Sequence, residues 1–242
     1  MATDIIKKVA IVTTIYNRSD GLRNTLMGLV KQKISFPYEV LVVDDGSEKN
    51  PESIIREYIP DNLLKFKRFD KNEGPIIAKP AAYNMASEDS NIFVYMGSDV
   101  ILLDTDCIEK LCKGVGEKIF TIGEVNTMDV ANDMYIRWDT EVKSMKERFY
   151  KMNPYFHTYC GSLKPTRWYI FLGALRKEDV DSINFFGSCD MIYYAALSRD
   201  KFKAVFPMVK AVHQTHPTRI GYCPIVGICK RGCSRRKNVN KK

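Results

Sequence analysis

The sequence predicts an α/β protein built on a mostly parallel, twisted sheet flanked by helices. Runs of β-branched and other apolar residues alternate with amphipathic segments four times within about the first hundred residues. The connections between successive runs are long enough to contain the crossover helix that parallel pairing requires. Helices then cover both faces of the sheet, which explains why the first run, residues 9–15, is almost continuously β-branched rather than alternating in polarity.

The elements of this first part follow in order. Predicted strands are residues 9–15, 38–45, 63–70 and 91–96, of which 63–70 alternates in polarity and should be an edge strand. Predicted helices are residues 19–32, 50–59, 75–88 and 104–115. Ser19 or Asp20 can cap the first helix. Its apolar stripe is expected to contain Leu22, Leu26, Leu29 and Val30. Pro51 suits the first turn of the second helix, and Pro80 is a candidate start of the third.

The alternation loosens after residue 117. Residues 117–125 and 167–175 resemble strands, residues 139–152 and 188–202 resemble helices, and an aromatic, turn-rich segment lies between them. A short strand precedes the histidines of 209–219. We expect one domain over residues 1–225, with unequal halves of about 1–104 and 105–225, followed by a basic tail over 226–242.

The basic charge of the chain belongs to its end. The net charge is +8, but residues 230–242 contain seven basic residues and no acid, so the rest carries +1. A nucleic-acid-binding domain would carry its basic residues on a folded face, and we expect no specific nucleic-acid partner. The tail lacks apolar periodicity and should be disordered, with at most weak contact to an anionic surface. No apolar run approaches the ~18 residues of a membrane span, and the start does not resemble a signal peptide, which favours a cytoplasmic protein.

The seven cysteines are an odd number, and in a cytoplasmic protein we expect free thiols. A structural zinc site is the alternative for the group His213, His216, Cys223, Cys229 and Cys233. The spacing of Cys223 and Cys229 is wider than such sites use, so reduced thiols in a loose segment are the preferred interpretation.

Polar and small residues follow each strand of the first half. In a parallel sheet these ends meet at one edge, where open α/β sheets bind ligands. The residues are Thr13, Thr14, Tyr16, Asn17 and Arg18; then Asp44, Asp45, Gly46 and Ser47; then Asn72, Gly74 and Lys79; and finally Gly97, Ser98 and Asp99. Carboxylates can accept hydrogen bonds from a nucleobase or ribose, and glycine lets a phosphate approach the backbone. Each motif by itself is also a turn signal, and it is the series of four that favours a ligand site.

The stretches "VAIVTTIYNRSDGLRNTLMGLVKQ", "YEVLVVDDGSEKN", "NEGPIIAKPAAYNMA" and "IFVYMGSDVIL" resemble the nucleotide-sugar half of a family 2 glycosyltransferase with the GT-A fold. The resemblance covers about residues 7–104. It implies a nucleotide-diphosphate-sugar donor, with a UDP-sugar favoured, contacted by Thr14 or Thr13 and by Asp44 or Asp45, with Lys79 assisting. The full set of expected donor contacts is Thr13, Thr14, Tyr16, Asn17, Arg18, Asp44, Asp45, Gly74, Lys79, Gly97 and Ser98.

The resemblance also implies a metal, Mn²⁺ or Mg²⁺. The fourth strand of the family ends in Asp-x-Asp, whereas this chain has Gly97-Ser98-Asp99, which leaves Asp99 alone in the metal position. Related enzymes add a histidine near the end of the catalytic half, and His213 or His216 fits that place. The alternative for either histidine is a loop-capping role.

The second half should supply the catalytic base that deprotonates an acceptor hydroxyl. The resemblance implies an acid at the start of a helix after an aromatic–glycine stretch, and Asp190 in "INFFGSCDMIYYAAL" fits; Glu178 and Asp179 are substitutes. The helix dipole is an alternative reason for an acid there. Arg219 or a residue of the tail could close over the diphosphate. Aromatic residues that are either acceptor wall or core are Tyr155, Phe156, Tyr159, Trp168 and Tyr169.

The sequence therefore predicts a metal-dependent, inverting glycosyltransferase that acts on a hydroxyl of a glycan, protein or lipid-linked acceptor. A non-catalytic nucleotide-sugar or glycan-binding module is the alternative, supported by the missing first Asp at Gly97. A nucleotidyltransferase would show a Gly-rich basic loop after its first strand, and "TTIYNRSDG" has one glycine.

Overall fold

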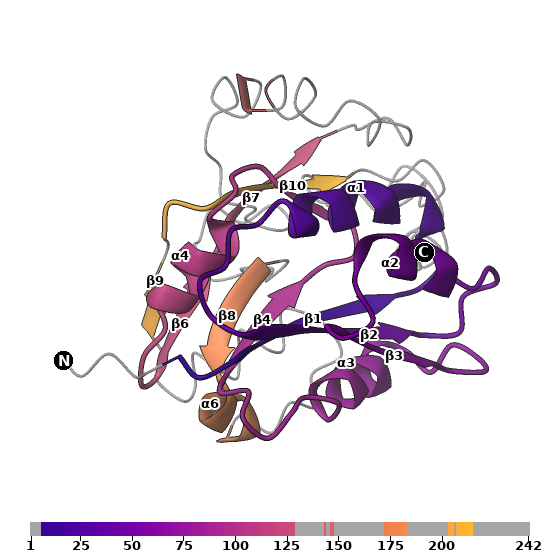
Figure 1. Cartoon of the computed structure of the whole chain (residues 1–242), viewed down its shortest axis with the longest axis horizontal. Helices are drawn as coiled ribbons and strands as arrows, with labels where there is room; N and C mark the ends of the chain where they lie inside the picture. Colours follow the sequence, from indigo (N-terminus) through magenta and orange to yellow (C-terminus); the bar gives the residue numbers. More distant parts are fainter. Residues whose placement is uncertain are drawn as a thin grey trace, which may run out of the picture.

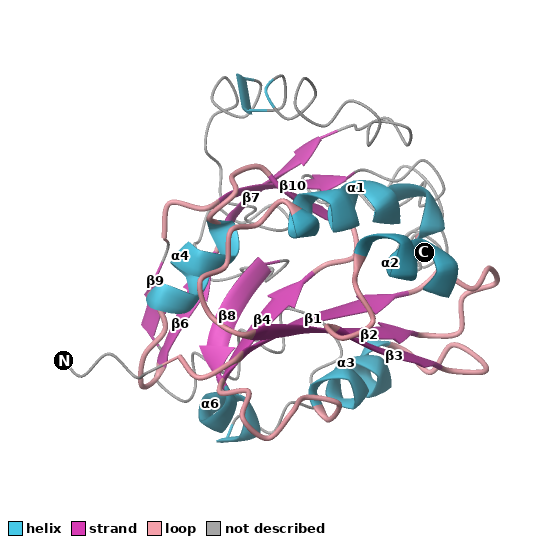
Figure 2. Ribbon diagram, viewed as in Figure 1, coloured by secondary structure: helices cyan, strands magenta, loops and turns pink. Residues whose placement is uncertain are grey.

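A computed structural model describes residues 6–128, 172–182, 203–205 and 207–214, together with residues 143, 146 and 147. In these residues the chain forms three layers, with one large sheet between two layers of helices (Figure 1 and Figure 2). A smaller sheet lies beside the first helix.

The central sheet has seven strands in the order β3-β2-β1-β4-β8-β6-β9. Their bounds are Val9–Ile15 (β1), Tyr38–Asp44 (β2), Leu64–Arg68 (β3), Ile92–Met96 (β4), Ile119–Ile122 (β6), Leu172–Arg176 (β8) and Lys203–Val205 (β9). The first four strands pair in parallel, and β8 is antiparallel to both of its neighbours. The prediction of a mostly parallel sheet is confirmed, and β3 is an edge strand as expected.

Helices cover both faces of this sheet. The face that contains Ile11, Val40 and Val94 packs against α1 (Ser19–Val30), α2 (Glu52–Tyr58) and α4 (Cys107–Lys113). The opposite face packs against α3 (Pro75–Tyr83) and α6 (Lys177–Ser182). The three leucines of the α1 stripe are buried, but Val30 is 42% exposed, so its predicted place in that stripe was wrong.

The two described cysteines, Cys107 and Cys112, are free thiols on the buried side of α4. Burial raises the pKa of Cys107 to about 12 and raises the pKa of Cys112 as well. Both thiols are therefore protonated at neutral pH and act as apolar core residues.

The smaller sheet has the order β5-β10-β7, with bounds Val100–Leu102 (β5), Lys210–Gln214 (β10) and Glu124–Met128 (β7). The predicted strand 117–125 is therefore two strands in different sheets. The chain turns between them at Gly123, where a Cβ atom would lie 2.6 Å from a Cδ atom of Leu172. Strand β5, which directly follows Asp99, was not predicted.

Two helix starts differ from the prediction. Arg18, rather than Ser19 or Asp20, occupies the N-cap position of α1, and no side chain caps that helix. Helix α3 begins at Pro75, with Pro80 inside it, so Pro80 is not its start.

Several predicted features lie outside the described residues. They are segments 153–167 and 188–202, the residues of 139–152 other than 143, 146 and 147, and the tail over 226–242. The division into two halves stays a prediction. Among the helices of the described part, none has the length and apolar character to cross a membrane.

Candidate functional site

The strands β1, β2 and β4 run in the same direction, so their carboxyl ends meet along one edge of the sheet. We call the loops after them, residues 16–18, 45–47 and 97–99, the carboxyl edge. The pairing of Ile15 with Asp44 and of Val12 with Tyr95 fixes the relative height of the three strand ends. The structure thus brings most of the predicted donor contacts together.

Hydrogen bonds join the first two loops of this edge. The backbone N–H of Asn17 donates to Ser47 Oγ (2.9 Å), and Asn17 Oδ1 accepts from the N–H of Glu48 (2.9 Å). Ser47 Oγ donates in turn to the carboxylate of Asp44, which is fully buried. Asn17 has a φ of 50°, a left-handed conformation that asparagine tolerates better than most residues. Asn17 and Asp44 therefore hold the shape of the carboxyl edge.

Asp45 ties the same edge to the start of α3. Its two carboxylate oxygens accept the backbone N–H groups of Glu73 (2.8 Å) and Gly74 (3.0 Å). Between Asp44 and Ser47, Gly46 lies so close to the chain that an added Cβ would be 2.2 Å from the carbonyl carbon of Lys71. The turn interpretation of "DDGS" is thus realised for Asp45 and Gly46, and a nucleotide contact by either aspartate stays a prediction.

The three candidates at the end of β1 differ in exposure. Thr13 is buried, and no described residue hydrogen-bonds its Oγ1. Thr14 is half-buried, and Tyr16 is 40% exposed. Tyr16 is accordingly the member of this group best placed to meet a ligand.

The third loop of the edge contains an ion pair. Arg18 Nη2 lies 3.5 Å from Asp99 Oδ2, and both side chains are largely buried, with 10% and 14% of their surface exposed. Ser98 presents its carbonyl oxygen to Thr25 Oγ1 of α1 (3.1 Å), and Gly97 accepts from the N–H of Val100 (3.1 Å). Asp99 is therefore held at the head of α1, beside a guanidinium.

Strand β10 comes to the same place from the other end of the described chain. The N–H of Gln214 donates to the carbonyl oxygen of Asp99 (2.8 Å), and His213 pairs in register with Val100. The backbone of His213 is thus adjacent to the Asp99 loop, as the metal-ligand prediction requires. The side chain of His213, the whole of His216 and the predicted base Asp190 lie outside the described residues.

Gln214 is a buried anchor that sequence reasoning missed. Its Nε2 donates to the carbonyl oxygen of Gly21 (3.0 Å) and to Thr25 Oγ1 (3.2 Å), and its Oε1 accepts from Asn24 Nδ2 (3.1 Å). A polar residue beside two histidines at the end of an apolar strand was the available signal.

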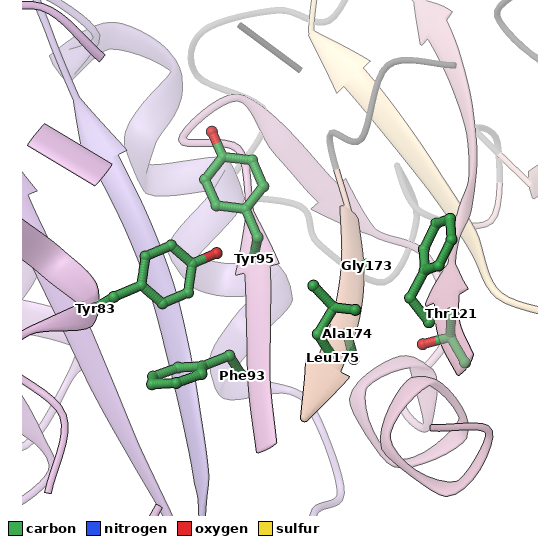
Figure 3. A pocket seen from close by; sticks show the side chains of 8 residues that line it. Tyr83, Phe93, Tyr95, Thr121, Gly173, Ala174 and Leu175 are labelled. Atoms are coloured by element: carbon green, nitrogen blue, oxygen red, sulfur yellow. The ribbon is translucent and has the colours of Figure 1, made fainter. Parts of the chain in front are cut away.

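Lys79 approaches the carboxyl edge from the opposite face of the sheet. It is buried on α3, and its ammonium lies 4.3 Å from the centre of the Tyr95 ring, a cation–π contact. Tyr95 also lines a small pocket between α3 and β8 (Figure 3). In this pocket the rings of Tyr83 and Phe93 meet edge to face, with 4.9 Å between their centres. Lys79 thus contacts a residue of β4 from helix α3 and does not belong to a loop of the carboxyl edge.

Glu178 and Asp179 are not brought to this site. Because β8 is antiparallel to β4, Leu172 pairs with Met96 near Asp99, whereas Arg176 pairs with Ile92 at the far end. Both acids follow Arg176 and form ion pairs with it, at 3.4 and 3.1 Å. About 15 Å of strand separates them from Asp99. Glu178 and Asp179 thus lie at the end of β8 that is remote from Asp99, and the assignment of the catalytic base stays a prediction.

The fit of a divalent cation can be tested against the donor atoms present. Asp99 offers a carboxylate, and β10 brings the backbone of a histidine beside it. No group of three or more His, Cys, Asp or Glu side chains that could hold a metal occurs among the described residues. Among the described residues the fit is thus limited to the Asp99 carboxylate, and a contribution of His213 or His216 stays a prediction.

The family model described as "Glycosyl transferase family 2" matches residues 10–171. The chain belongs to glycosyl transferase family 2. Its fold is similar to residues 1–349 of Staphylococcus aureus TarS, with a TM-score of 0.59, 13% identity and coverage of 86% of this chain and 60% of that one. It is equally similar to the mannosyltransferase PcManGT of Pyrobaculum calidifontis, solved with GDP-Man and Mn²⁺, with a TM-score of 0.59, 18% identity and coverage of 87% and 58%. These neighbours have the GT-A fold, and so does this family 2 chain.

Relatives by sequence match shorter stretches. Escherichia coli chondroitin synthase is 46% identical over 63 residues, which is 26% of this chain and 9% of that protein. TarP of Staphylococcus aureus, a poly(ribitol-phosphate) β-N-acetylglucosaminyltransferase, is 26% identical over 133 residues, or 54% of this chain and 37% of that protein. The family 2 chain thus spans a minor part of the length of these relatives.

Proposed function

We propose that this family 2 chain transfers a sugar from a nucleotide-diphosphate donor to a hydroxyl acceptor, with inversion at the anomeric carbon. The meeting of Arg18, Asp99 and strand β10 at the carboxyl edge is the observation that carries the proposal. Three distant segments of the chain converge there on one cation, one carboxylate and the backbone of a histidine. Such a site suits a bound diphosphate better than it suits a neutral ligand.

The chemistry needs two groups that act on opposite sides of the anomeric carbon. The oxygen of the acceptor hydroxyl forms a bond to the anomeric carbon, and Asp190 accepts the proton that this hydroxyl loses. The bond between the carbon and the phosphate oxygen breaks, and its electron pair leaves with the diphosphate. Arg18 offers a planar set of N–H donors to this departing anion, and positive charge aimed at developing negative charge lowers the barrier.

A divalent cation, Mn²⁺ or Mg²⁺, would add positive charge at the diphosphate when it is bound by Asp99 with His213 or His216. Gly97 has no side chain to offer either the metal or the ribose. We therefore expect the metal to depend on Asp99, and Tyr16 and Thr14 to contribute contacts to the nucleotide.

The relatives indicate which donors and acceptors to try first. TarS has been solved with UDP-GlcNAc, and the named activities of TarP and of chondroitin synthase concern polymers. This favours a UDP-sugar and a glycan acceptor; GDP-Man in PcManGT makes a GDP-sugar the second choice. Protein and lipid-linked acceptors remain in the panel.

Isothermal titration with UDP, GDP and dTDP, each with and without Mn²⁺, tests the donor site. We expect one nucleotide to bind, more tightly with metal, and Asp99→Asn to abolish the metal effect. Asp106→Asn is a matched control, because Asp106 pairs with Lys110 on the surface of α4. Failure of every nucleotide to bind would contradict the proposal.

A non-catalytic binding module is favoured by one feature, the glycine at position 97. A turnover assay distinguishes the two functions. Its donor is a nucleotide-diphosphate sugar that contains the nucleotide found to bind. Release of nucleotide diphosphate that is lost in Asp190→Asn supports transfer, whereas tight binding without turnover across the acceptor panel supports the module.

A further inference from the structure

The ion pair between Arg18 and Asp99 lies where a donor-bound metal is expected. The two residues are 81 positions apart in the chain, and their side chains are largely shielded from water. Arg18 occupies the N-cap of α1, and the backbone on either side of Asp99 is held by β4 and by β5. Both partners therefore adjoin regular elements at each side, and their closeness follows from the fold.

This arrangement opposes the binding of a free metal ion. A divalent cation on Asp99 would lie a few ångströms from the guanidinium, and like charges repel strongly at such a distance in a site with little water. Arginine stays charged at any physiological pH, so it cannot relieve the repulsion by losing a proton. Movement of the guanidinium away from Asp99 would therefore favour metal binding.

The glycine at position 97 makes the competition sharper. A second carboxylate at position 97 would offer a further negative charge at this loop. Here the motif reads Gly97-Ser98-Asp99, so one carboxylate has to serve both cations. A diphosphate would offer the guanidinium another anion, with geometry suited to two parallel hydrogen bonds.

We propose that Arg18 and the divalent cation compete for Asp99, and that the donor diphosphate ends the competition by taking over Arg18. Metal binding then depends on donor binding, and Arg18 is the residue that couples them. The inference rests on the proposed function, because it takes a nucleotide diphosphate to be the ligand of this edge.

Mn²⁺ binding, followed by the electron paramagnetic resonance signal of the free ion, tests the coupling. Phosphates bind Mn²⁺ themselves, so the diagnostic measurement is the affinity in the absence of nucleotide. Arg18→Gln should bind Mn²⁺ at least about tenfold more tightly than the wild type without UDP, a coupling in the usual range for linked sites. Arg23→Gln is the matched control, because it removes one positive charge from an exposed ion pair with Glu57 on the same helix. It should leave the affinity unchanged.

Two further variants complete the design. Arg18→Lys keeps the charge but has a compact ammonium in place of the planar guanidinium, so its Mn²⁺ affinity should lie between those of the wild type and Arg18→Gln. It also serves if Arg18→Gln fails to fold, which circular dichroism would show. Asp99→Asn should abolish Mn²⁺ binding at this site, both in the otherwise wild-type protein and in combination with Arg18→Gln.

The inference is overturned if Arg18→Gln, folded, binds Mn²⁺ no more tightly than the wild type and Arg23→Gln. It is also overturned if Arg18→Lys matches Arg18→Gln. Failure of the proposed function looks different: no nucleotide binds to any variant, whatever the Mn²⁺ affinities are.

Discussion

Two glycines, Gly46 of the carboxyl edge and Gly74 at the start of α3, show how single residues shape the site. Gly46 and Gly74 both have a positive φ, 71° and 85°, which side chains other than glycine rarely adopt. They differ in their surroundings. An added Cβ would be 2.2 Å from the backbone of Lys71 at Gly46, whereas nothing lies within 4 Å at Gly74. A substitution at Gly74 therefore tests backbone strain alone, whereas one at Gly46 tests strain together with a steric clash against the backbone of Lys71.

We expect Gly74→Ala to lower the free energy of unfolding by about 1 kcal/mol, through strain alone. Gly46→Ala should cost roughly 2–4 kcal/mol, because the segment at Lys71 must also move. Urea unfolding of both variants measures the difference. Equal costs would mean that the loop after β3 yields freely, and the close packing of residues 45–47 against it would then not hold the edge in place.

At the scale of elements, a buried carboxylate fastens β2 to the segment that follows α3. Glu39 accepts hydrogen bonds from Ser87 N (2.7 Å), Ser87 Oγ (2.8 Å) and Ser90 Oγ (2.7 Å), and lies 3.0 Å from Lys65 Nζ. Burial by itself would raise the pKa of Glu39, but these partners outweigh it and lower the pKa to about 2 from an ordinary value of 4.5. The charged form is therefore the one that stabilises the fold.

A lowered pKa gives a definite pH dependence. The contribution of Glu39 is fully present above its unfolded pKa and is lost as the pH falls toward its folded pKa. Between about pH 6 and pH 3, the unfolding free energy of the wild type should fall by roughly 2 kcal/mol more than that of Glu39→Gln. Urea titrations at intermediate pH values measure the gap. If the unfolding free energies of the two proteins change with pH in parallel, the ionised form of Glu39 does not stabilise the fold.

The elements that could be predicted from sequence are those whose pattern is decided locally. Strand β1 is a nearly continuous β-branched run and β2 has a run of four apolar residues, and their observed bounds agree with the predicted ones within one residue. The break at Gly123 was missed because it depends on Leu172, a residue distant in the chain. Strand β5 was missed because its three residues pair with β10, more than a hundred positions later. Contacts with residues distant in the chain decide both features, and the local hydrophobic pattern contains no information about such contacts.

The same division holds for the candidate site. The strand-end residues could be assigned to one edge, because parallel pairing forces strand ends together. The distance of Glu178 and Asp179 from that edge could not be predicted, because the sequence does not reveal that β8 runs antiparallel to β4. The pairing of Arg18 with Asp99 needed the position of α1 over the sheet.

At the scale of the whole molecule, Gln214 joins the last described strand to the first helix and to the Asp99 loop. Its side chain makes three buried hydrogen bonds to α1, while its N–H holds the carbonyl of Asp99. Gln32 is a natural comparison at the other end of α1. Its Nε2 donates to Gly28 O (3.0 Å) and Asp104 O (2.7 Å), and its Oε1 accepts from the N–H of Ile108 (3.3 Å).

Gln214→Ala should therefore lower the free energy of unfolding by about 2–4 kcal/mol, because its three partners on α1 lose their hydrogen bonds in a buried place. Gln32→Ala should cost less, about 1–2 kcal/mol, since its surroundings are partly open to water. The variants should differ more clearly in ligand binding than in stability. Gln214→Ala releases β10 from α1 and so loosens the support of the Asp99 loop and of the His213 backbone. The affinities for Mn²⁺ and for nucleotide, each measured with the other present, should therefore both drop by about tenfold. Gln32→Ala should leave them unchanged. Titration calorimetry on both variants decides the matter: equal affinities would mean that β10 supports the fold without positioning the site.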